Sequence, residues 1–269
     1  MIKLGINSVL FKGYDFRTAA KYIKAAGYDG VEISGILGMC EHLAPTRWKE
    51  DKAKLIAASK DYDLPFLSTE VASRDLERLK LAFEACAEIG IPIVNIGPGG
   101  KSNVEEDVQK SIAELNAAAE LAEKYGITLC CKAHVNAAIY NTPTTLRMME
   151  EVKSPAFGVD MDPSHILRSG ENPVDALPQV ISRVKHIHIR DCMKPVGGIG
   201  GAPGTPTIQT PGRAELDLLG YFKAMAAANY DGPVCLEIIG PQLSLENAIV
   251  VAAEARGYLN ALRKVATEA

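Results

Sequence analysis

The sequence lacks a strong excess of either charge. Its 29 lysines and arginines stand against 33 aspartates and glutamates, which gives a formal net charge of -4. This balance provides no broad attraction to nucleic acid phosphates or anionic lipids, so we expect neither as a partner. The chain also lacks an apolar run near the roughly 20 residues of a membrane span, and its start, MIKLGINSVLFKG, lacks a basic secretory signal. We therefore expect a cytoplasmic protein without membrane contact.

Cysteine pairs with the CxxC spacing of zinc and redox motifs are absent, and six cysteines in 269 residues are too few for a disulfide scaffold. Three of them lie inside apolar, strand-like runs. We interpret all six as reduced thiols of the core rather than as zinc ligands or redox groups. They are Cys40, Cys86, Cys130, Cys131, Cys192 and Cys235.

Short β-rich runs alternate with longer segments of helical periodicity along the whole chain. The eight predicted strands are residues 3–7, 30–34, 65–70, 92–96, 128–132, 156–161, 184–189 and 233–238. The predicted helices are residues 16–26, 48–62, 75–89, 105–125, 144–152, 173–180, 216–229 and 244–265. Such alternation implies parallel strands joined by right-handed crossovers.

Eight strand and helix units predict an α/β fold of the (β/α)₈ TIM-barrel type, with an open doubly wound sheet as the alternative. Several strands, such as IPIVNI and PVCLEI, are nearly continuous apolar runs, as expected when protein covers both faces. No linker or change of composition divides the chain. We therefore assign residues 1–269 to a single barrel domain.

Ionisable residues gather where the last four predicted strands end, and barrel active sites form at these ends. Four of the five histidines lie there together with carboxylates, a mixture that suits Mn²⁺, Mg²⁺ or Zn²⁺. Structural ion pairs are the alternative, and His186 alone is better explained as a hydrogen-bonded core imidazole. The candidates are Lys132, His134, Asp160, Asp162, His165, His186, His188, Asp191 and Glu237.

Further candidates lie outside these four ends. Asn95 and the following Gly-Pro-Gly-Gly turn are placed to approach a sugar hydroxyl or phosphate, although a plain strand-to-helix turn explains them equally well. Glu32 and Glu70 end two early strands and either line the pocket or form salt bridges in the barrel. Residues 192–213 form a long Gly- and Pro-rich stretch, which predicts a lid or substrate loop. Its Arg213 is a candidate clamp for a phosphate or carboxylate, or else a solvated surface residue.

Four motifs, GYDGVEIS, DPSHILRSGENP, VKHIHIRD and CLEIIG, resemble the sugar phosphate isomerase/epimerase family, the xylose-isomerase-like TIM barrels. The resemblance covers essentially the whole chain. It implies one divalent metal held by a glutamate after the fifth strand and by Asp162, His188 and Glu237. It also implies that His165 contacts substrate or metal.

The chain departs from this pattern at the fifth strand, where relatives typically read Glu-x-His and this sequence reads Lys132-Ala133-His134. The change removes a negative ligand and adds a cation that repels a metal. Two outcomes remain open. Either a metal still binds through Asp162, His188 and Glu237, which is the favoured interpretation, or the Lys132 ammonium occupies the place of the metal.

The resemblance implies an isomerase or epimerase that removes a proton next to the carbonyl of a sugar, keto-sugar or inositol-like substrate. Glu237 is then the base, and Lys132 or His134 handles the second proton. One alternative is a lyase or dehydratase, because the same enolate can expel a β-hydroxyl. A second is a non-catalytic sugar-binding barrel. The expected partner is a small polyhydroxylated molecule, and a homo-oligomer remains open.

Overall fold

The structure, a computed structural model, describes residues 2–196 and 200–268; residues 197–199 of the predicted loop therefore lie outside the described residues. Eight parallel strands form a closed barrel, because β1 pairs with both β2 and β9. The described residues also contain β3, a short strand that pairs antiparallel with β2 outside the barrel. The strands are β1 (Lys3–Asn7), β2 (Gly30–Ile36), β3 (Cys40–Glu41), β4 (Phe66–Glu70), β5 (Ile93–Ile96), β6 (Thr128–Lys132), β7 (Phe157–Met161), β8 (Val184–Ile189) and β9 (Pro233–Leu236).

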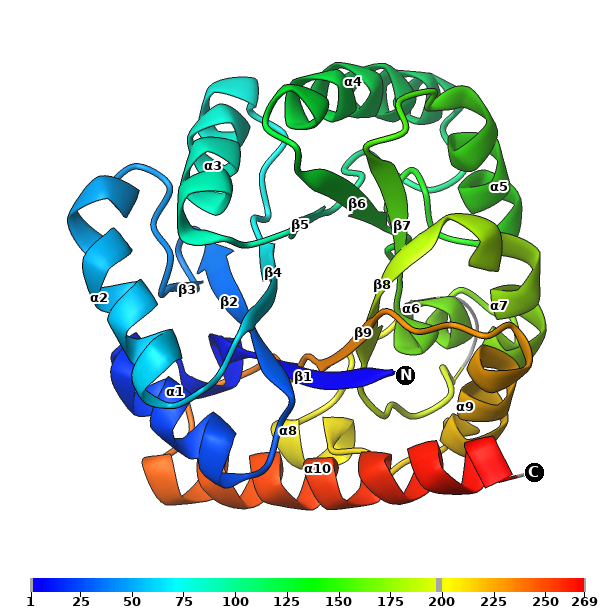
Figure 1. The fold of residues 1–269 in the computed structure, drawn as a ribbon. Coiled ribbons are helices and arrows are strands. Elements are labelled where there is room, and N and C mark those ends of the chain that lie inside the picture. Colours follow the sequence, from blue (N-terminus) through cyan, green and yellow to red (C-terminus); the bar gives the residue numbers. More distant parts are fainter. Residues whose placement is uncertain (1, 197–199, 269) are drawn as a thin grey trace.

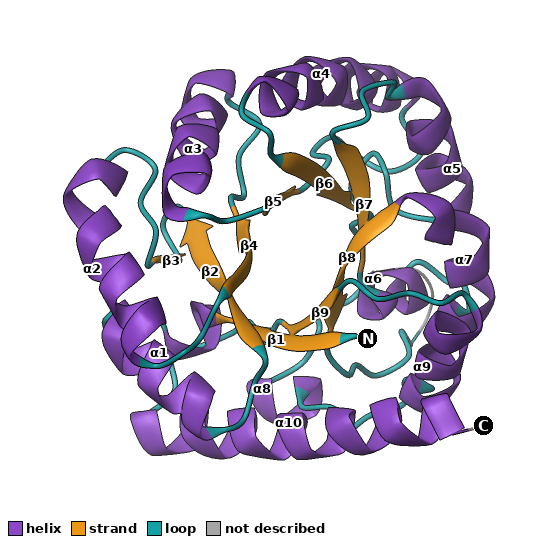
Figure 2. Cartoon of the chain, viewed as in Figure 1, coloured by secondary structure: helices purple, strands orange, loops and turns teal. Residues whose placement is uncertain are grey.

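Helices form an outer ring around the strands, as Figures 1 and 2 show. Each of the eight predicted helices is present with ends that differ by two or three residues at most, whereas α6, α8 and the two 3-10 helices were not predicted. The helices are α1 (Phe16–Ala25), α2 (Trp48–Asp61), α3 (Leu76–Ile89), α4 (Glu105–Lys124), α5 (Thr142–Glu151), α6 (Pro163–Arg168), α7 (Pro173–Val180), α8 (Pro206–Gln209), α9 (Leu218–Ala227) and α10 (Leu245–Glu268), with η1 (Ser8–Phe11) and η2 (Ile181–Arg183).

Local signals in the sequence set many helix ends. The Asp15 side chain accepts a hydrogen bond from the backbone N–H of Thr18 at the start of α1, and Asp75 does the same for Arg78 at the start of α3. Gly90 ends α3 in the left-handed conformation at φ 90°, which a residue without Cβ adopts readily. The two aspartates fix the starts of α1 and α3, and the turn at Gly90 leads from α3 to β5.

The barrel separates an apolar layer from a polar interior. Alternate strand residues point outward and pack against the helices as one large hydrophobic cluster. Inward residues are largely polar and pair with residues of other strands across the barrel. Glu32 of β2 contacts His188 of β8, and Lys132 of β6 contacts Glu237 after β9. The interior of this barrel is therefore a buried site for charged groups.

All six cysteines are buried and free, which confirms that they are unpaired core thiols. Among the described residues, no helix combines the length and apolarity needed to cross a bilayer.

We predict that Gly30→Ala destabilises the barrel. A methyl group at Gly30 would lie 2.6 Å from Cγ of Leu67 and 2.7 Å from the carbonyl oxygen of Pro65, whose backbone cannot move away easily. Such overpacking costs about 1–3 kcal/mol. The control is Gly257→Ala in α10, where a methyl group meets nothing within 4 Å, and where we expect a gain of roughly 0.5–1 kcal/mol. Urea unfolding measures both, and equal stabilities of the two variants would contradict this packing.

Candidate active site

A pocket of about 520 Å³ opens at the carboxyl ends of the strands. Its volume suits a small ligand, for which pockets of about 300–1,000 Å³ are usual. Three ionisable groups of the barrel, Glu70, Lys132 and His134, line it. The full lining is Glu70, Ala72, Ser73, Arg74, Asp75, Gly97, Pro98, Gly99, Lys132, His134 and Ala137.

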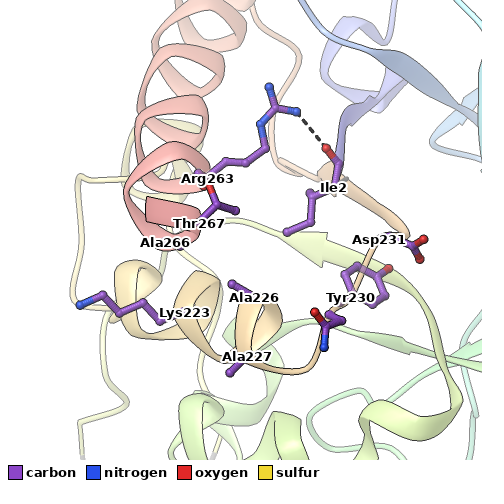
Figure 3. A pocket seen from close by; sticks show the side chains of 10 residues that line it. Ile2, Lys223, Ala226, Ala227, Tyr230, Asp231, Arg263, Ala266 and Thr267 are labelled. Carbon is purple, nitrogen blue, oxygen red and sulfur yellow. Dashed lines mark hydrogen bonds between the residues drawn. The ribbon is translucent and has the colours of Figure 1, made fainter. Parts of the chain in front are cut away.

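A larger cavity of about 760 Å³ lies at the opposite end of the barrel, between α9, α10 and the start of β1 (Figure 3). Ile2, Tyr230 and Arg263 are among its lining residues, and Arg263 donates a hydrogen bond to the carbonyl of Ile2. Since TIM-barrel active sites form at the carboxyl ends of the strands, we place the chemistry in the smaller pocket.

Strand β6 supplies the two groups at the centre of this pocket. It ends at Lys132, whose side chain is 5% exposed, and His134 follows at the exposed rim. The backbone N–H of His134 donates to the carbonyl of Ile139, which fixes the turn after the strand. The two residues are therefore held close together by the strand, one deep and one shallow.

A chain of acidic and basic side chains, here called the upper ion-pair chain, crosses the barrel beneath the pocket. The Lys132 ammonium lies 3.0 Å from both carboxylate oxygens of Glu237 and 3.2 Å from Oε1 of Glu70. Arg190 lies 3.1 Å from Oε2 of Glu237 and 2.8 Å from Oδ2 of Asp162. The upper ion-pair chain consists of Glu70, Lys132, Glu237, Arg190 and Asp162.

Asp162 has a structural role as well as a charge. It follows β7 directly and caps α6, because Oδ1 accepts hydrogen bonds from the backbone and the hydroxyl of Ser164 at 2.8 and 2.6 Å. Pro163 in the first turn is preset for a helix start. Oδ2 faces Arg190. Both carboxylate oxygens of Asp162 are thus engaged within the protein.

Arg190 is the main site residue that the sequence did not reveal. It is 1% exposed, and its Nε donates to Oγ of Ser164 at 2.8 Å while Nη2 donates to Asp162. Burial opposes its charge, but Asp162 and Glu237 raise the pKa of Arg190 above its usual value. The period of two that aligned His186 with His188 extends to Arg190, and this signal was available in VKHIHIRD.

The pKa values of three members of the upper ion-pair chain are shifted by their surroundings. Burial opposes ionisation of Lys132, but Glu237 and Glu70 outweigh it and raise the pKa of this amine. Burial also opposes the charge on Glu237, yet Lys132 and other cations hold its pKa well below the usual value. Burial and the neighbouring Glu237 raise the pKa of Glu70 well above normal. These shifts favour the ammonium form of Lys132, the carboxylate form of Glu237 and, relative to an ordinary glutamate, the protonated form of Glu70.

His134 has the tautomer that a base requires. Its Nδ1 lies 2.9 Å from the carbonyl oxygen of Val135, and because a carbonyl only accepts, Nδ1 carries the hydrogen. The lone pair is therefore on Nε2. Burial and the nearby Lys132 lower the pKa of His134. The ring lies 3.9 Å from that of His165, centroid to centroid.

His165 lies under His134 and does not itself line the pocket. It is 2% exposed, its Nε2 is 2.7 Å from Nη2 of Arg190, and Arg168 approaches its Nδ1 at 2.7 Å. Burial is the main cause, and the positive charge of Arg190 the second, of a pKa of His165 that lies well below normal. Contrary to the predicted substrate contact, the structure places His165 as a neutral ring that supports His134.

A second set of groups, here called the lower imidazole cluster, lies deeper in the barrel. His186 contacts Asp160 through Nδ1 at 3.0 Å and Ser68 through Nε2 at 2.9 Å. His188 lies between two carboxylates, with Nδ1 2.7 Å from Asp160 and Nε2 against Glu32. The lower imidazole cluster consists of Glu32, Ser68, Asp160, His186 and His188.

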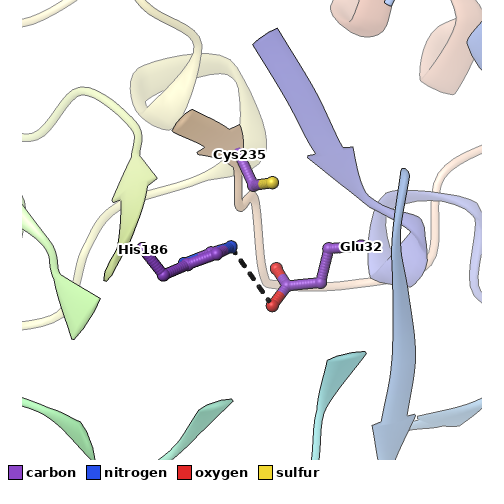
Figure 4. Close-up of side chains that lie close together, drawn as sticks. All are labelled: Glu32, His186 and Cys235. Atoms are coloured by element: carbon purple, nitrogen blue, oxygen red, sulfur yellow. Dashed lines mark ion pairs between the residues drawn. The ribbon is translucent and has the colours of Figure 1, made fainter. Parts of the chain in front are cut away.

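Opposite charges on both sides keep His188 protonated. Burial opposes its charge, but Asp160 and Glu32 raise the pKa of His188 well above normal. Figure 4 shows His186 directed toward Glu32, at 3.8 Å, with the Cys235 thiol beside them. The expectation of a hydrogen-bonded core imidazole at His186 is confirmed.

Three further predicted residues lie away from the pocket surface. Asn95 is fully buried and donates to Oε1 of Glu32 at 2.6 Å, so the expected direct substrate contact is corrected to a contact with the lower imidazole cluster. Arg213 pairs with Glu254 of α10 at 2.6 Å on the outer surface, as the alternative of a surface residue predicted. Asp191 accepts hydrogen bonds from the backbone of the following loop, including Gly212, and so orients that loop.

Three groups of side chains among the described residues place ligand atoms within 4.8 Å of one another, as a metal site requires. His188 belongs to two of these groups, but Asp162 and Glu237 belong to none of the three. The groups are Glu32 with His186 and Cys235, Asp160 with His186 and His188, and Glu32 with Glu70 and His188.

The residues at the position of the family metal do not fit that metal. Lys132 stands where a fourth ligand is needed, and its ammonium contacts both oxygens of Glu237. Arg190 faces Asp162 and Glu237 from the other side. Each of these carboxylates is therefore already paired with a cation of the protein.

Comparisons with known proteins agree with this fold. The family described as xylose isomerase-like TIM barrel matches residues 20–262. An inosose dehydratase from Clostridium perfringens is 27% identical over 171 residues, which is 60% of this chain and 57% of that protein, so the match spans little more than half of its length. A 3-dehydroshikimate dehydratase from Pseudomonas putida is 25% identical over 223 residues, 80% of this chain and 35% of that protein.

A solved structure of a D-tagatose 3-epimerase-like protein has the same fold. It superposes with a TM-score of 0.78 at 15% identity and covers 99% of both chains. This likeness concerns the fold alone.

We predict that Asp162→Ala lowers stability more than Asp162→Asn, by about the 0.5–2 kcal/mol that a helix cap contributes, because both variants remove the charge that faces Arg190. The alanine removes both the helix cap and the partner of a buried arginine, and an uncompensated buried charge costs about 3–5 kcal/mol. Asparagine retains the cap because its side-chain oxygen accepts the same hydrogen bonds. Thermal and urea unfolding measure the difference. Equal losses in the two variants would show that the cap contributes nothing at this position.

Proposed function

The chain belongs to the xylose isomerase-like TIM-barrel family, and from this we propose that it removes a proton next to the carbonyl of a small polyhydroxylated compound. The observation that carries the proposal is the pairing of an ammonium, Lys132, with a neutral imidazole, His134, in one open pocket. An electrophile beside a base is what enolate formation needs.

Lys132 is the group that stabilises the enolate oxygen. Its ammonium is fixed by Glu237 and Glu70, so it presents a positive charge without reorganising. Because the amine stays protonated, attack on the carbonyl to form a Schiff base is disfavoured. Glu237 lies behind Lys132, outside the pocket lining, and acts as a positioning residue.

His134 is the base. The lone pair on Nε2 belongs to an exposed ring at the pocket rim, and Nδ1–H is held by Val135. The imidazole accepts the proton from the carbon next to the carbonyl. This removal leaves an enolate whose negative oxygen lies beside the Lys132 ammonium.

Loss of water is the outcome that we propose for the enolate. Glu70 lines the same pocket, and a neutral carboxylic acid there donates its proton to the β-hydroxyl as the carbon–oxygen bond breaks. The substrate then loses one hydrogen and one hydroxyl as water. His134 is left protonated and Glu70 ionised, and transfer of one proton between them through water restores the site. The named sequence relatives, both dehydratases, support this outcome.

Isomerisation or epimerisation is the second candidate. It uses the same enolate, but Glu70 returns a proton to carbon instead of to the leaving hydroxyl. Unequal acid and base groups suit elimination better than a symmetrical exchange of protons between two carboxylates. Because both reactions pass through the same enolate, only the product distinguishes one from the other.

The proposal is tested by incubating the protein in ²H₂O with inosose, 3-dehydroshikimate and D-tagatose, followed by NMR and mass spectrometry. We expect a product that has lost one water from one of the two cyclic ketones. Deuterium incorporation without loss of water would favour the epimerase. Binding of these ketones with neither deuterium exchange nor water loss would contradict the proposal and favour a sugar-binding protein.

Substitutions in the pocket give a further prediction. His134→Gln lowers kcat by about 10²–10⁴-fold because it removes the base, and Lys132→Met lowers it by about 10²–10³-fold because the enolate loses its cation. Lys185→Met, on the exposed outside of β8, is the matched control and leaves kcat unchanged. Steady-state kinetics on the substrate identified above provide the readout; full activity of His134→Gln would remove His134 from the mechanism.

The pH profile provides an independent check of the base. The pKa of His134 lies below its ordinary value of 6.5, mainly because of burial. Since the base works only when neutral, kcat/KM falls as pH drops through this lowered pKa and is level at neutral pH. The acid limb is absent from His134→Gln. A limb centred above 6.5, or one that persists in this variant, would assign it to another group.

A further inference from the structure

The upper ion-pair chain contains two permanent cations against two ionised carboxylates. We propose that Lys132 and Arg190 together take the place of a divalent cation, so that the active protein holds no metal. This inference rests on the proposed function for the role of Lys132 in catalysis, but the absence of a metal is independent of any turnover.

The three side chains that the resemblance implies as metal ligands already contact other groups of the protein. Asp162 directs one oxygen to Ser164 and the other to Arg190. Glu237 has both oxygens within 3.0 Å of Lys132. His188 has carboxylates at both ring nitrogens. Each of the three ligands that the family resemblance implies is therefore engaged within the protein.

The charges in the upper ion-pair chain also oppose a divalent cation. Asp162 and Glu237 bear two negative charges, and Lys132 with Arg190 balances them at distances of 2.8–3.1 Å. A divalent ion bound to the same carboxylates would have to lie next to two fixed cations in a water-poor interior, where like charges repel strongly. Removing either cation from its partner would also leave an unpaired buried charge.

Of the three groups of possible ligand atoms, the one nearest the pocket contains Glu32, Glu70 and His188. Its oxygens already accept from Asn7, which donates to Oε2 of Glu32 at 2.9 Å and to Oε2 of Glu70 at 3.1 Å. Oε1 of Glu70 faces Lys132. These contacts leave the carboxylates of Glu32 and Glu70 already paired with donors of the protein.

The wild-type protein gives the first test. After dialysis against Mn²⁺, Mg²⁺ and Zn²⁺ in turn and removal of free ions, elemental mass spectrometry should find well under one equivalent of each metal. Neither these ions nor a chelator should shift Tm. A near-stoichiometric metal whose removal lowers Tm would overturn the inference, whether or not a substrate has been found.

A pair of variants locates the effect. Lys132→Glu replaces the ammonium with a carboxylate, so we expect this variant to take up about one equivalent of Mn²⁺ or Zn²⁺ and to gain Tm in its presence. Lys132→Met, the control, removes the cation without adding a ligand and should bind far less metal. Equal metal uptake by wild type and Lys132→Glu would contradict a blocking role for Lys132. If Lys132→Glu does not fold, the wild-type measurements still decide the inference.

Failure of this inference is distinguishable from failure of the proposed function. If the wild-type protein is metal-free and turns over no ketone, the inference holds and the proposed activity is wrong. A metal-containing wild type that dehydrates a ketone does the opposite. In active wild-type protein, treatment with a chelator should change kcat by less than about twofold, since no step depends on a metal.

Discussion

The ion pair between Lys132 and Glu237 is the interaction on which the rest of the site depends. Both side chains are almost fully buried, and neither charge is tolerable there without the other. The pair fixes the ammonium below the pocket, keeps Glu237 ionised and, through burial and the charge of Glu237, raises the pKa of Glu70. Arg190 forms a second buried ion pair, with Asp162. Asp162 in turn caps α6 and thereby places His165 under His134. One buried ion pair thus connects the barrel strands, the first helix after β7 and the base at the pocket rim.

The barrel makes this arrangement possible because its interior is polar where many barrels are filled with aliphatic layers. The lower imidazole cluster closes the bottom of the site with buried imidazoles and carboxylates in contact, and the upper ion-pair chain lies above it. Of the described ionisable residues in these two layers, Glu70 and Lys132 line the pocket. The reactive surface is therefore small, while a much larger set of buried charges holds it in place. Such preorganisation is the main contribution of a rigid scaffold to electrostatic catalysis.

The strands were predictable because their signals are local: β1, β6 and β8 have the predicted bounds, and the caps Asp75 and Gly90 lie at the two ends of the helix predicted over residues 75–89. Convergence at the carboxyl ends was also predictable, since it follows from parallel strands and a period of two. Pairing across the barrel was not. Whether Glu237 faces a metal or Lys132, and whether Asn95 reaches the pocket or Glu32, depends on strands distant in sequence. Arg213 shows the same limit, because its partner Glu254 lies 41 residues away on α10.

The most direct test of this account is the charge state of Lys132. Protein labelled with ¹⁵N-lysine, compared with Lys132→Met to assign the signal, allows its Nζ to be titrated by NMR. The account predicts an ammonium that persists above the usual lysine pKa of 10.5, because Glu237 and Glu70 raise the pKa of this amine. A resonance that titrates near neutral pH would contradict the account, since a neutral amine neither replaces a metal cation nor stabilises an enolate.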